Sequence, residues 1–187
     1  MLFVLFQLGN DRYALEASQV VEVIPLVALK KLPQSPKGIA GFFVYRGQPV
    51  PAVDLGELLL GKPARERLST RIIVVNNADS PREISTEVSP DRGPGQTISR
   101  GKPGAASRMV SGRLGLIAER ATATMKSETK AFKELGMQLA TTPCLGPVLT
   151  DEKGVIQLVQ PRMLSGLVAN IREPSPEPAS EAGHVAH

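Results

Sequence analysis

Short apolar runs recur along this chain at intervals of about eight to twelve residues, and turn-forming residues separate them. Runs of this length are typical of strands, because an amphipathic helix needs a longer periodic segment. The spacing therefore predicts an all-β fold, either a barrel or a sandwich. Strands are predicted over 2–8, 13–17, 20–24, 26–32, 39–45, 49–54 and 70–75, and short helical segments over 56–60, 127–135 and 161–166.

The composition is that of an ordinary globular protein with an aliphatic core. Hydrophobic residues make up 42% of the 187 residues and charged residues 21%, whereas aromatic residues make up 4% and tryptophan is absent. No apolar run approaches the roughly 20 residues that span a bilayer. The single cysteine excludes an intramolecular disulfide framework and favours a reducing compartment. We therefore expect a cytoplasmic protein.

Two stretches are too polar to form part of a packed core. Residues 77–108 are rich in Ser, Pro, Gly and charge, and the last fifteen or so residues have the same character. We expect one domain over 1–168, with 77–108 as a flexible insert in its second half, and a disordered tail over 169–187.

A weak internal repeat relates the two halves of that domain. Residues 12–23 (RYALEASQVVEV) parallel 113–124 (RLGLIAERATAT), and residues 41–59 parallel 146–164 as strand, turn and strand. Such a repeat predicts two similar β subdomains, with the insert lying inside the second.

The net charge of +4 raises the alternative of a small β-barrel that binds nucleic acid. The basic residues are scattered, however, and the densest group, Lys62, Arg65, Arg67 and Arg71, also contains Glu66. A single-strand binder would be expected to offer stacking aromatic side chains, and the chain has few. Nucleic-acid binding is kept as the second hypothesis.

Enzymatic chemistry finds little support in the residue types. Both histidines, His184 and His187, lie in the predicted tail, so that a His-based nucleophile pair or metal site is not expected in the folded part. Cys144 follows a proline beside an apolar run, which favours a buried residue over a nucleophile. The acids at strand ends are single residues, although acids distant in sequence can meet in space. They are Asp54, Glu57, Glu119 and Asp151. We predict no catalysis and no cofactor.

The stretch GIAGFFVYRGQPVPAVDLGELL (38–59) carries the clearest functional signal. Pro49 and Pro51 lie two apart, so their missing N–H donors fall on one edge of a strand and leave the other edge free to pair with 39–45. Gly47 suits a tight turn, and Arg46 beside it must point outward, since a buried guanidinium would need a partner. The arginine either merely solubilises the turn or is presented to a binding partner.

The same stretch resembles the signature of the CheW-like domain, the coupling module of bacterial chemosensory systems. The resemblance rests on the Arg-Gly turn followed by the Pro-containing strand that ends in Asp54-Leu55. It extends upstream to YALEASQVVEVI and downstream to TRIIVV, GRLGLIAERATATM and LGPVLTDEKGVIQLVQPRML, and thus covers 1–76 and 109–168. Val44 and Tyr45 stand where the signature usually has Asn-Leu.

The resemblance implies a fold, a function and a site. The fold is a pair of five-stranded SH3-like β-barrel subdomains packed together. The function is that of a non-catalytic adaptor that links the hairpin tip of chemoreceptors (methyl-accepting chemotaxis proteins) to the regulatory domain of a CheA-type histidine kinase. Such a protein meets the membrane only through receptors and does not bind nucleic acid. The implied receptor-binding groove contains Val20, Glu22, Gly41, Arg46 and Gly47.

Overall fold

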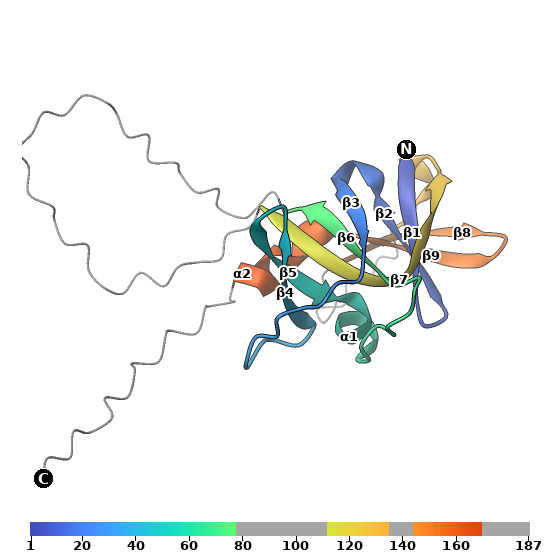
Figure 1. The fold of residues 1–187 in the computed structure, drawn as a ribbon. Helices are drawn as coiled ribbons and strands as arrows, with labels where there is room; N and C mark the ends of the chain where they lie inside the picture. Colours follow the sequence, from blue (N-terminus) through green and yellow to red (C-terminus); the bar gives the residue numbers. More distant parts are fainter. Residues whose placement is uncertain (78–111, 135–143, 170–187) are drawn as a thin grey trace, which may run out of the picture.

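The computed structural model describes residues 1–77, 112–134 and 144–169, and within them the fold is mostly β (Figure 1). The strands are β1 (Leu2–Leu8), β2 (Asp11–Glu16), β3 (Val20–Pro25), β4 (Ile39–Tyr45), β5 (Gln48–Asp54), β6 (Arg71–Asn76), β7 (Arg113–Lys126), β8 (Leu145–Asp151) and β9 (Gly154–Val159). The helices are α1 (Leu55–Leu60) and α2 (Ser165–Ala169), with 3₁₀ turns η1 (Ala17–Gln19), η2 (Thr129–Ala131) and η3 (Pro161–Leu164). No helix in these described ranges is long and apolar enough to cross a bilayer.

The predicted strand pattern is confirmed at most positions. β1 and β4 have the predicted bounds, and β2, β3, β5 and β6 differ from theirs only at the ends. The helical turn predicted over 56–60 is α1, which Asp54 caps by accepting a hydrogen bond from the Glu57 N–H at 3.1 Å. Gly61 ends α1 with φ 69°, a conformation that glycine adopts without steric cost.

Two predicted elements are wrong. Residues 26–32 form no strand; only Lys30 makes an isolated bridge, to Phe42. The helix predicted over 127–135 is reduced within the described residues to the 3₁₀ turn η2, whose N-cap is Glu128. The reason is tertiary pairing, because Lys133 exchanges backbone hydrogen bonds of 2.7 and 2.9 Å with Val148. Local helix propensity is a weak preference that such contacts readily override.

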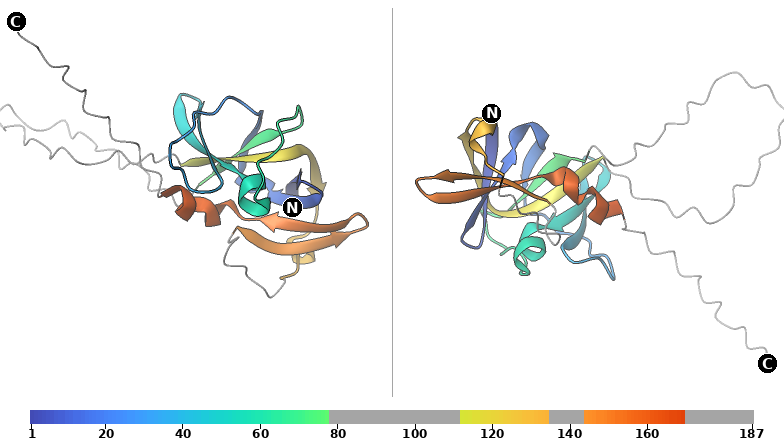
Figure 2. Two further views of the ribbon diagram at one scale, coloured as in Figure 1. Left: turned by 90° about the horizontal axis from the view of Figure 1, so that it is seen from below. Right: turned by 180° about the vertical axis from the view of Figure 1, so that it is seen from behind.

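The strands form two five-stranded sheets that share β7. The first sheet has the order β7–β1–β2–β9–β8, and the second has the order β3–β6–β7–β5–β4. In each sheet one pair is parallel, β2 with β9 and β5 with β7, and the other pairs are antiparallel. The β8–β9 and β4–β5 hairpins therefore lie at opposite ends of the molecule, as all ribbon views show (Figures 1 and 2).

This topology confirms the internal repeat. The two sheets have the same arrangement of strands. β1 of the first sheet corresponds to β6 of the second, β2 to the N-terminal half of β7, β9 to β5, and β8 to β4. The repeated segments 12–23 and 113–124 correspond to β2–η1–β3 and to the continuous strand β7. The structure thus contains two similar β units, while the closure of each sheet into a barrel stays a prediction.

A bulge lets β7 cross from one sheet to the other. Arg113–Ala118 pairs with β6, and the strand then pairs with β1 from Glu119 to Lys126. The register of the β1–β7 pairing shifts between Leu5 and Gln7, which lie opposite Ala123 and Glu119, and Arg120 within the shift has φ 48°. β7 has two more residues than β1 within this shift. Extra residues of this kind bend a strand and increase its twist, as a strand shared by two sheets requires.

The core is largely aliphatic, as predicted from the composition. Its largest cluster joins side chains of both sheets and of α1, including Leu15, Leu116 and Leu55, each fully buried. Phe6 stacks on Tyr13 with ring centroids 5.5 Å apart, and Phe3 packs against Phe132. The main aromatic residues are therefore used for packing.

The hairpin β8–β9 is tied to β2 by a bidentate ion pair. The guanidinium of Arg12 donates to both carboxylate oxygens of Asp151, at 2.6 and 2.8 Å. Asp151 also accepts a hydrogen bond from the Lys153 N–H at 2.8 Å, which fixes the turn. The bonds from Arg12 and then from Lys153 lower the pKa of Asp151 from 3.8 to about 2.

This ion pair predicts an acid-sensitive contribution to stability. Because the folded-state pKa of Asp151 is depressed, its contribution is complete above about pH 4 and is lost as the pH falls toward 2. Thermal denaturation of the wild type and of Asp151→Asn should therefore show melting temperatures that differ at neutral pH and converge toward about pH 2. A constant difference over this range would contradict the assignment.

The predicted insert, 77–108, lies outside the described residues except for Asn77, as does the predicted tail except for Ala169. The chain on either side of 78–111 is a paired hairpin: Asn76 lies opposite Arg113, and the Asn77 N–H donates to the Gly112 carbonyl at 2.9 Å. This connection corresponds in the repeat to the short turn between β1 and β2. The boundaries of the insert and tail stay predictions.

Replacing residues 78–111 by Asn-Gly tests the insert prediction. A two-residue turn of this kind suits an antiparallel hairpin, and long surface loops add only slowly to the entropic cost of closure. We expect the free energy of unfolding, as measured by urea denaturation, not to fall and to rise by up to about 2.5 kcal/mol, because the loop is shortened by about four doublings of its length. A loss of stability would show that the segment contributes to packing.

Candidate interaction site at the β4–β5 turn

The β4–β5 hairpin turns through two residues, Arg46 and Gly47. Tyr45 lies opposite Gln48, and the turn residues have φ values of 50° and 78°. Positive φ at both positions is the type I′ arrangement, whose twist matches that of paired strands. The prediction of a tight turn that directs Arg46 outward is confirmed, since its side chain is 65% exposed.

The prolines in β5 lie where the sequence predicted. Pro49 and Pro51 are opposite Val44 and Phe42 of β4, and pairing of β5 with β7 begins only beyond them, at Ala52. The edge that lacks donors at the prolines is thus unpaired there, which agrees with their chemistry.

Glu22 of β3 joins Arg46 in one cluster. The guanidinium of Arg46 donates to Glu22 Oε2 at 3.1 Å, and the Tyr45 hydroxyl donates to the same oxygen at 2.5 Å. The pKa of Glu22 is lowered, chiefly by the hydrogen bond from Tyr45 and then by Arg46. The bond to Glu22 in turn raises the pKa of Tyr45. Glu22 is therefore held as a carboxylate beside the turn.

Tyr45 orients the cluster by contacts with two guanidinium groups. The guanidinium carbons of Arg46 and Arg113 lie 5.2 and 5.1 Å from the centroid of its ring. Arginines at this distance interact favourably with an aromatic ring. The buried ring packs in a second core cluster, with Phe43, Val50 and Ile72, so it holds Arg46 at the surface in a defined position.

The residues assigned to the groove therefore divide into two groups. Glu22, Arg46 and Gly47 lie together at the turn. Val20 is half-buried against the largest core cluster, and Gly41 lies at the other end of β4, against the backbone of residues 30–31.

Sequence reasoning missed two members of the cluster, Tyr45 and Arg113. Tyr45 precedes the arginine in the quoted stretch, and its position at the end of a strand could have identified it. Arg113 opens one copy of the repeat, but its approach to Tyr45 depends on the pairing of β7 with β5 and β6.

The acids named from the sequence mostly have structural contacts. Asp54 accepts hydrogen bonds from the Glu57 and Ala64 N–H groups, Glu119 accepts one from the Arg65 N–H, and Asp151 binds Arg12. Within residues 1–77, 112–134 and 144–169, no three His, Cys, Asp or Glu side chains are placed to hold a metal ion.

Cys144 is fully buried in the largest core cluster, as predicted. Burial raises the pKa of its thiol from 9.0 to about 11, which lowers the thiolate fraction at neutral pH by about a hundredfold. We expect an aromatic disulfide reagent to modify Cys144 at least about a hundredfold more slowly in the native protein than in urea. Equal rates would contradict the burial.

The fold and this hairpin define a class of protein: residues 2–89 match the model of the CheW-like domain family. The chain is 26% identical over 77 residues to the chemotaxis protein CheW of Helicobacter pylori (strain ATCC 700392 / 26695). That alignment covers 41% of this chain and 47% of the relative, so the chain spans about half the length of the curated relative it matches.

A solved structure shows the same fold. The scaffolding protein TtCheW from Thermoanaerobacter tengcongensis superposes with a TM-score of 0.60 at 20% identity, over 85% of this chain and 83% of that one. The chain therefore contains a CheW-like domain and is distantly homologous to chemotaxis protein CheW. The resemblance noted in the sequence is confirmed.

Proposed function

We propose that this protein is a non-catalytic scaffold that couples chemoreceptors to a CheA-type histidine kinase. The observation that carries the proposal is the match to the CheW-like domain over residues 2–89, a span that contains β3, the β4–β5 hairpin and the Arg46 turn. The arrangement of that turn supports it, because a type I′ hairpin with an aromatic support presents a guanidinium at little entropic cost.

The proposed receptor-binding groove contains Val20, Glu22, Gly41, Arg46 and Gly47, with different roles. Arg46 would donate a charge-assisted hydrogen bond to an acid of the receptor helix, and Val20 would bury an apolar side chain. Glu22 holds the guanidinium of Arg46, and its negative charge disfavours receptors that place an acid next to Glu22. Gly47 permits the positive φ of the turn, and Gly41 permits the close approach of residues 30–31 to β4.

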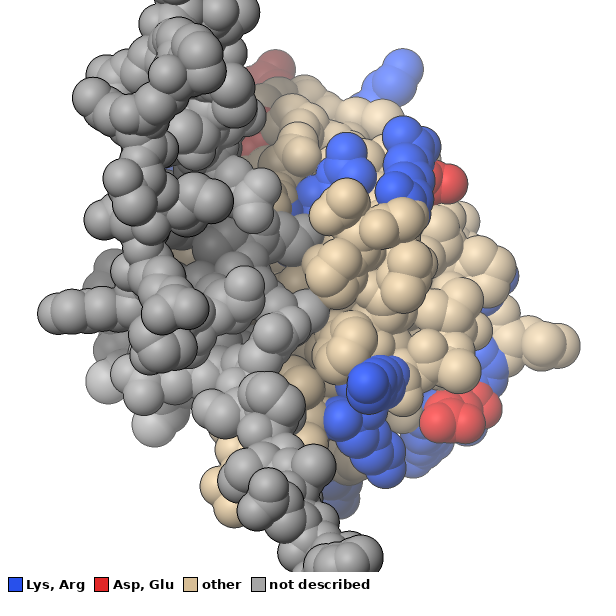
Figure 3. Space-filling view, turned by 60° about the vertical axis from the view of Figure 1, so that its left-hand side comes forward, with Lys and Arg blue, Asp and Glu red and all other residues tan. Residues whose placement is uncertain are grey.

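The proposal extends to the architecture. We propose that each five-stranded sheet closes into a small SH3-like barrel, and that the kinase regulatory domain binds at the ends of these units. Figure 3 shows a face on which Lys and Arg gather at two places with uncharged surface between them. Such a face suits a receptor helix that carries both acidic and apolar residues.

Co-sedimentation tests the proposal with two separate partners, a fragment containing a receptor hairpin tip and the kinase regulatory domain. We expect the wild type to bind both, and substitutions at Arg46 to weaken receptor binding much more than kinase binding. Filter binding of mixed oligonucleotides at physiological salt serves as the comparison. Failure to bind either protein, together with retention of oligonucleotides, would replace the scaffold proposal by the nucleic-acid alternative.

A further inference from the structure

A pocket of about 680 Å³ lies on the second sheet, away from the Arg46 turn. The segment that follows β3, the start of α1 and the residues after α1 enclose it. A volume of this size can take several side chains of a partner. Its apolar lining includes Leu26, Leu29, Leu32, Ile39 and Ile117.

The pocket carries more negative than positive charge. Asp54, Glu57 and Glu66 line it, against Lys31 alone. The oxygens of Asp54 accept backbone hydrogen bonds, whereas no ion pair within the described part of the chain involves Glu57 or Glu66. The site therefore favours an occupant that combines an apolar side chain with a positive charge.

The chain presents such a segment in the loop between α1 and β6. Leu68 is 96% exposed, more than any other large hydrophobic side chain among the described residues. Arg65 and Arg67 beside it are exposed as well. Leu68 therefore contributes nothing to the core of its own chain, and its exposure carries a hydration cost that docking would relieve.

The backbone of this loop is held in place, so that Leu68 is presented in a defined position. Thr70 is buried, and its hydroxyl donates to the Arg65 carbonyl at 2.5 Å and accepts from the Arg67 N–H at 3.3 Å. The Arg71 guanidinium donates to the carbonyls of Leu68 and Thr70. A preordered loop loses little conformational entropy on binding.

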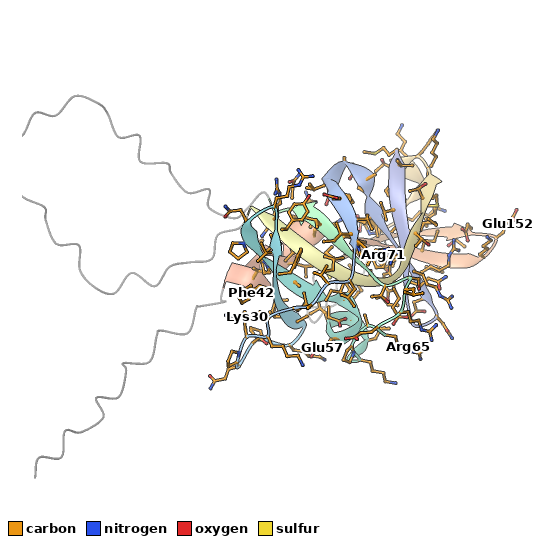
Figure 4. All side chains as sticks on the ribbon, viewed as in Figure 1. Lys30, Phe42, Glu57, Arg65, Arg71 and Glu152 are labelled. Atoms are coloured by element: carbon orange, nitrogen blue, oxygen red, sulfur yellow. The ribbon has the colours of Figure 1, made fainter. Side chains whose placement is uncertain are left out.

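Pocket and loop lie next to each other on the surface. Pro63 and Glu66 of the loop also line the pocket, and Figure 4 shows Glu57 and Arg65 along the same lower edge of the molecule. Leu68 does not fill the pocket of its own chain, because it is almost fully exposed. Two copies related by a two-fold axis can each place Leu68 in the pocket of the other, because such an interface uses the same patch twice.

We propose that this face is a self-association surface, in which Leu68 of one copy enters the pocket of a second copy and Arg67 approaches Glu57 across the interface. One apolar anchor and a rim charge on each side make a weak dimer, with a dissociation constant between about 10 μM and about 1 mM. Neither the Arg46 turn nor receptor binding is involved.

Sedimentation equilibrium over that concentration range tests the surface. The wild-type mass should rise with concentration, and Leu68→Ser should weaken the association about a hundredfold, since both copies lose an anchor. Arg67→Glu and Glu57→Lys should each weaken it about tenfold, and the double variant should recover most of the loss. Val44→Ser is the matched control, because Val44 is 70% exposed on β4 and lies outside the pocket; it should leave the mass unchanged.

Three results would overturn the proposal: a wild type that stays monomeric up to about 1 mM, a Leu68→Ser variant that associates like the wild type, or a double variant no stronger than the single ones. Circular dichroism of each variant confirms that the fold is retained. Leu68 and Arg67 make no core contact, so a folding defect in their variants would also contradict the placement of the loop.

Discussion

Gly41→Ala is expected to lower the free energy of unfolding by about 3–5 kcal/mol and the melting temperature by roughly 10 °C. Gly41 has φ 136°, and a Cβ atom there would lie 2.3 Å from the Lys30 carbonyl oxygen and 3.0 Å from the carbonyl carbon. Backbone cannot move aside as a flexible side chain can. Relief would break the two Lys30–Phe42 hydrogen bonds, 2.9 and 3.0 Å long, that attach residues 30–31 to β4.

Gly47→Ala is the matched control for this substitution. Gly47 also has positive φ, 78°, but its Cβ would meet nothing within 4 Å. Only the backbone strain remains, and a loss of about 1 kcal/mol is expected. Urea denaturation of both variants measures the difference. If the two substitutions lower the free energy of unfolding by the same amount, the close approach of Lys30 to β4 is wrong.

This result bears on the proposed groove. A Gly41 variant that binds receptor poorly could do so through damage to β4, because the glycine lies against backbone and away from the Arg46 cluster. Receptor binding by such a variant therefore has to be compared at a temperature where circular dichroism shows it fully folded.

Arg46→Asn is expected to weaken receptor binding about 10- to 150-fold, the range of a lost charge-assisted hydrogen bond. Asparagine removes the charge and still tolerates the positive φ of this position, so the turn is kept. The melting temperature should change little, because exposed ion pairs contribute little to stability. Kinase binding should also change little. Co-sedimentation with the two partners separately measures both effects.

A charge exchange separates the internal ion pair from the receptor contact. In the double variant Glu22→Arg/Arg46→Glu, opposite charges still face each other across the turn, so the fold should be retained. Receptor binding should nevertheless stay weak, because the positive charge is now on β3. Val20→Asp should weaken receptor binding similarly by preventing apolar burial. Normal binding by Arg46→Asn would instead show that Arg46 only solubilises the turn.

The sequence predicted the local features of the fold well because each has a local cause. The alternation of apolar runs and turns located β1 and β4 at their observed bounds, and the helical segment predicted over 56–60 is α1. Pro49 and Pro51 indicated which edge of β5 pairs with β4. The Arg46–Gly47 turn followed from the residues that tolerate positive φ, and the repeat predicted two similar units.

The tertiary structure alone decided the features that depend on partners distant in sequence. β7 divides its pairing between two sheets, and Lys133 pairs with Val148 where a helix was predicted. Arg113 contacts Tyr45 although residues 78–111 separate them in the sequence. Arg46 was predicted as an outward charge, but its contact with Glu22 depends on the placement of β3 beside the turn. Residue type and local periodicity determine the preference of a short segment, whereas these contacts arise from burial and hydrogen bonding shared among strands, which outweigh a preference worth less than about 1 kcal/mol per residue.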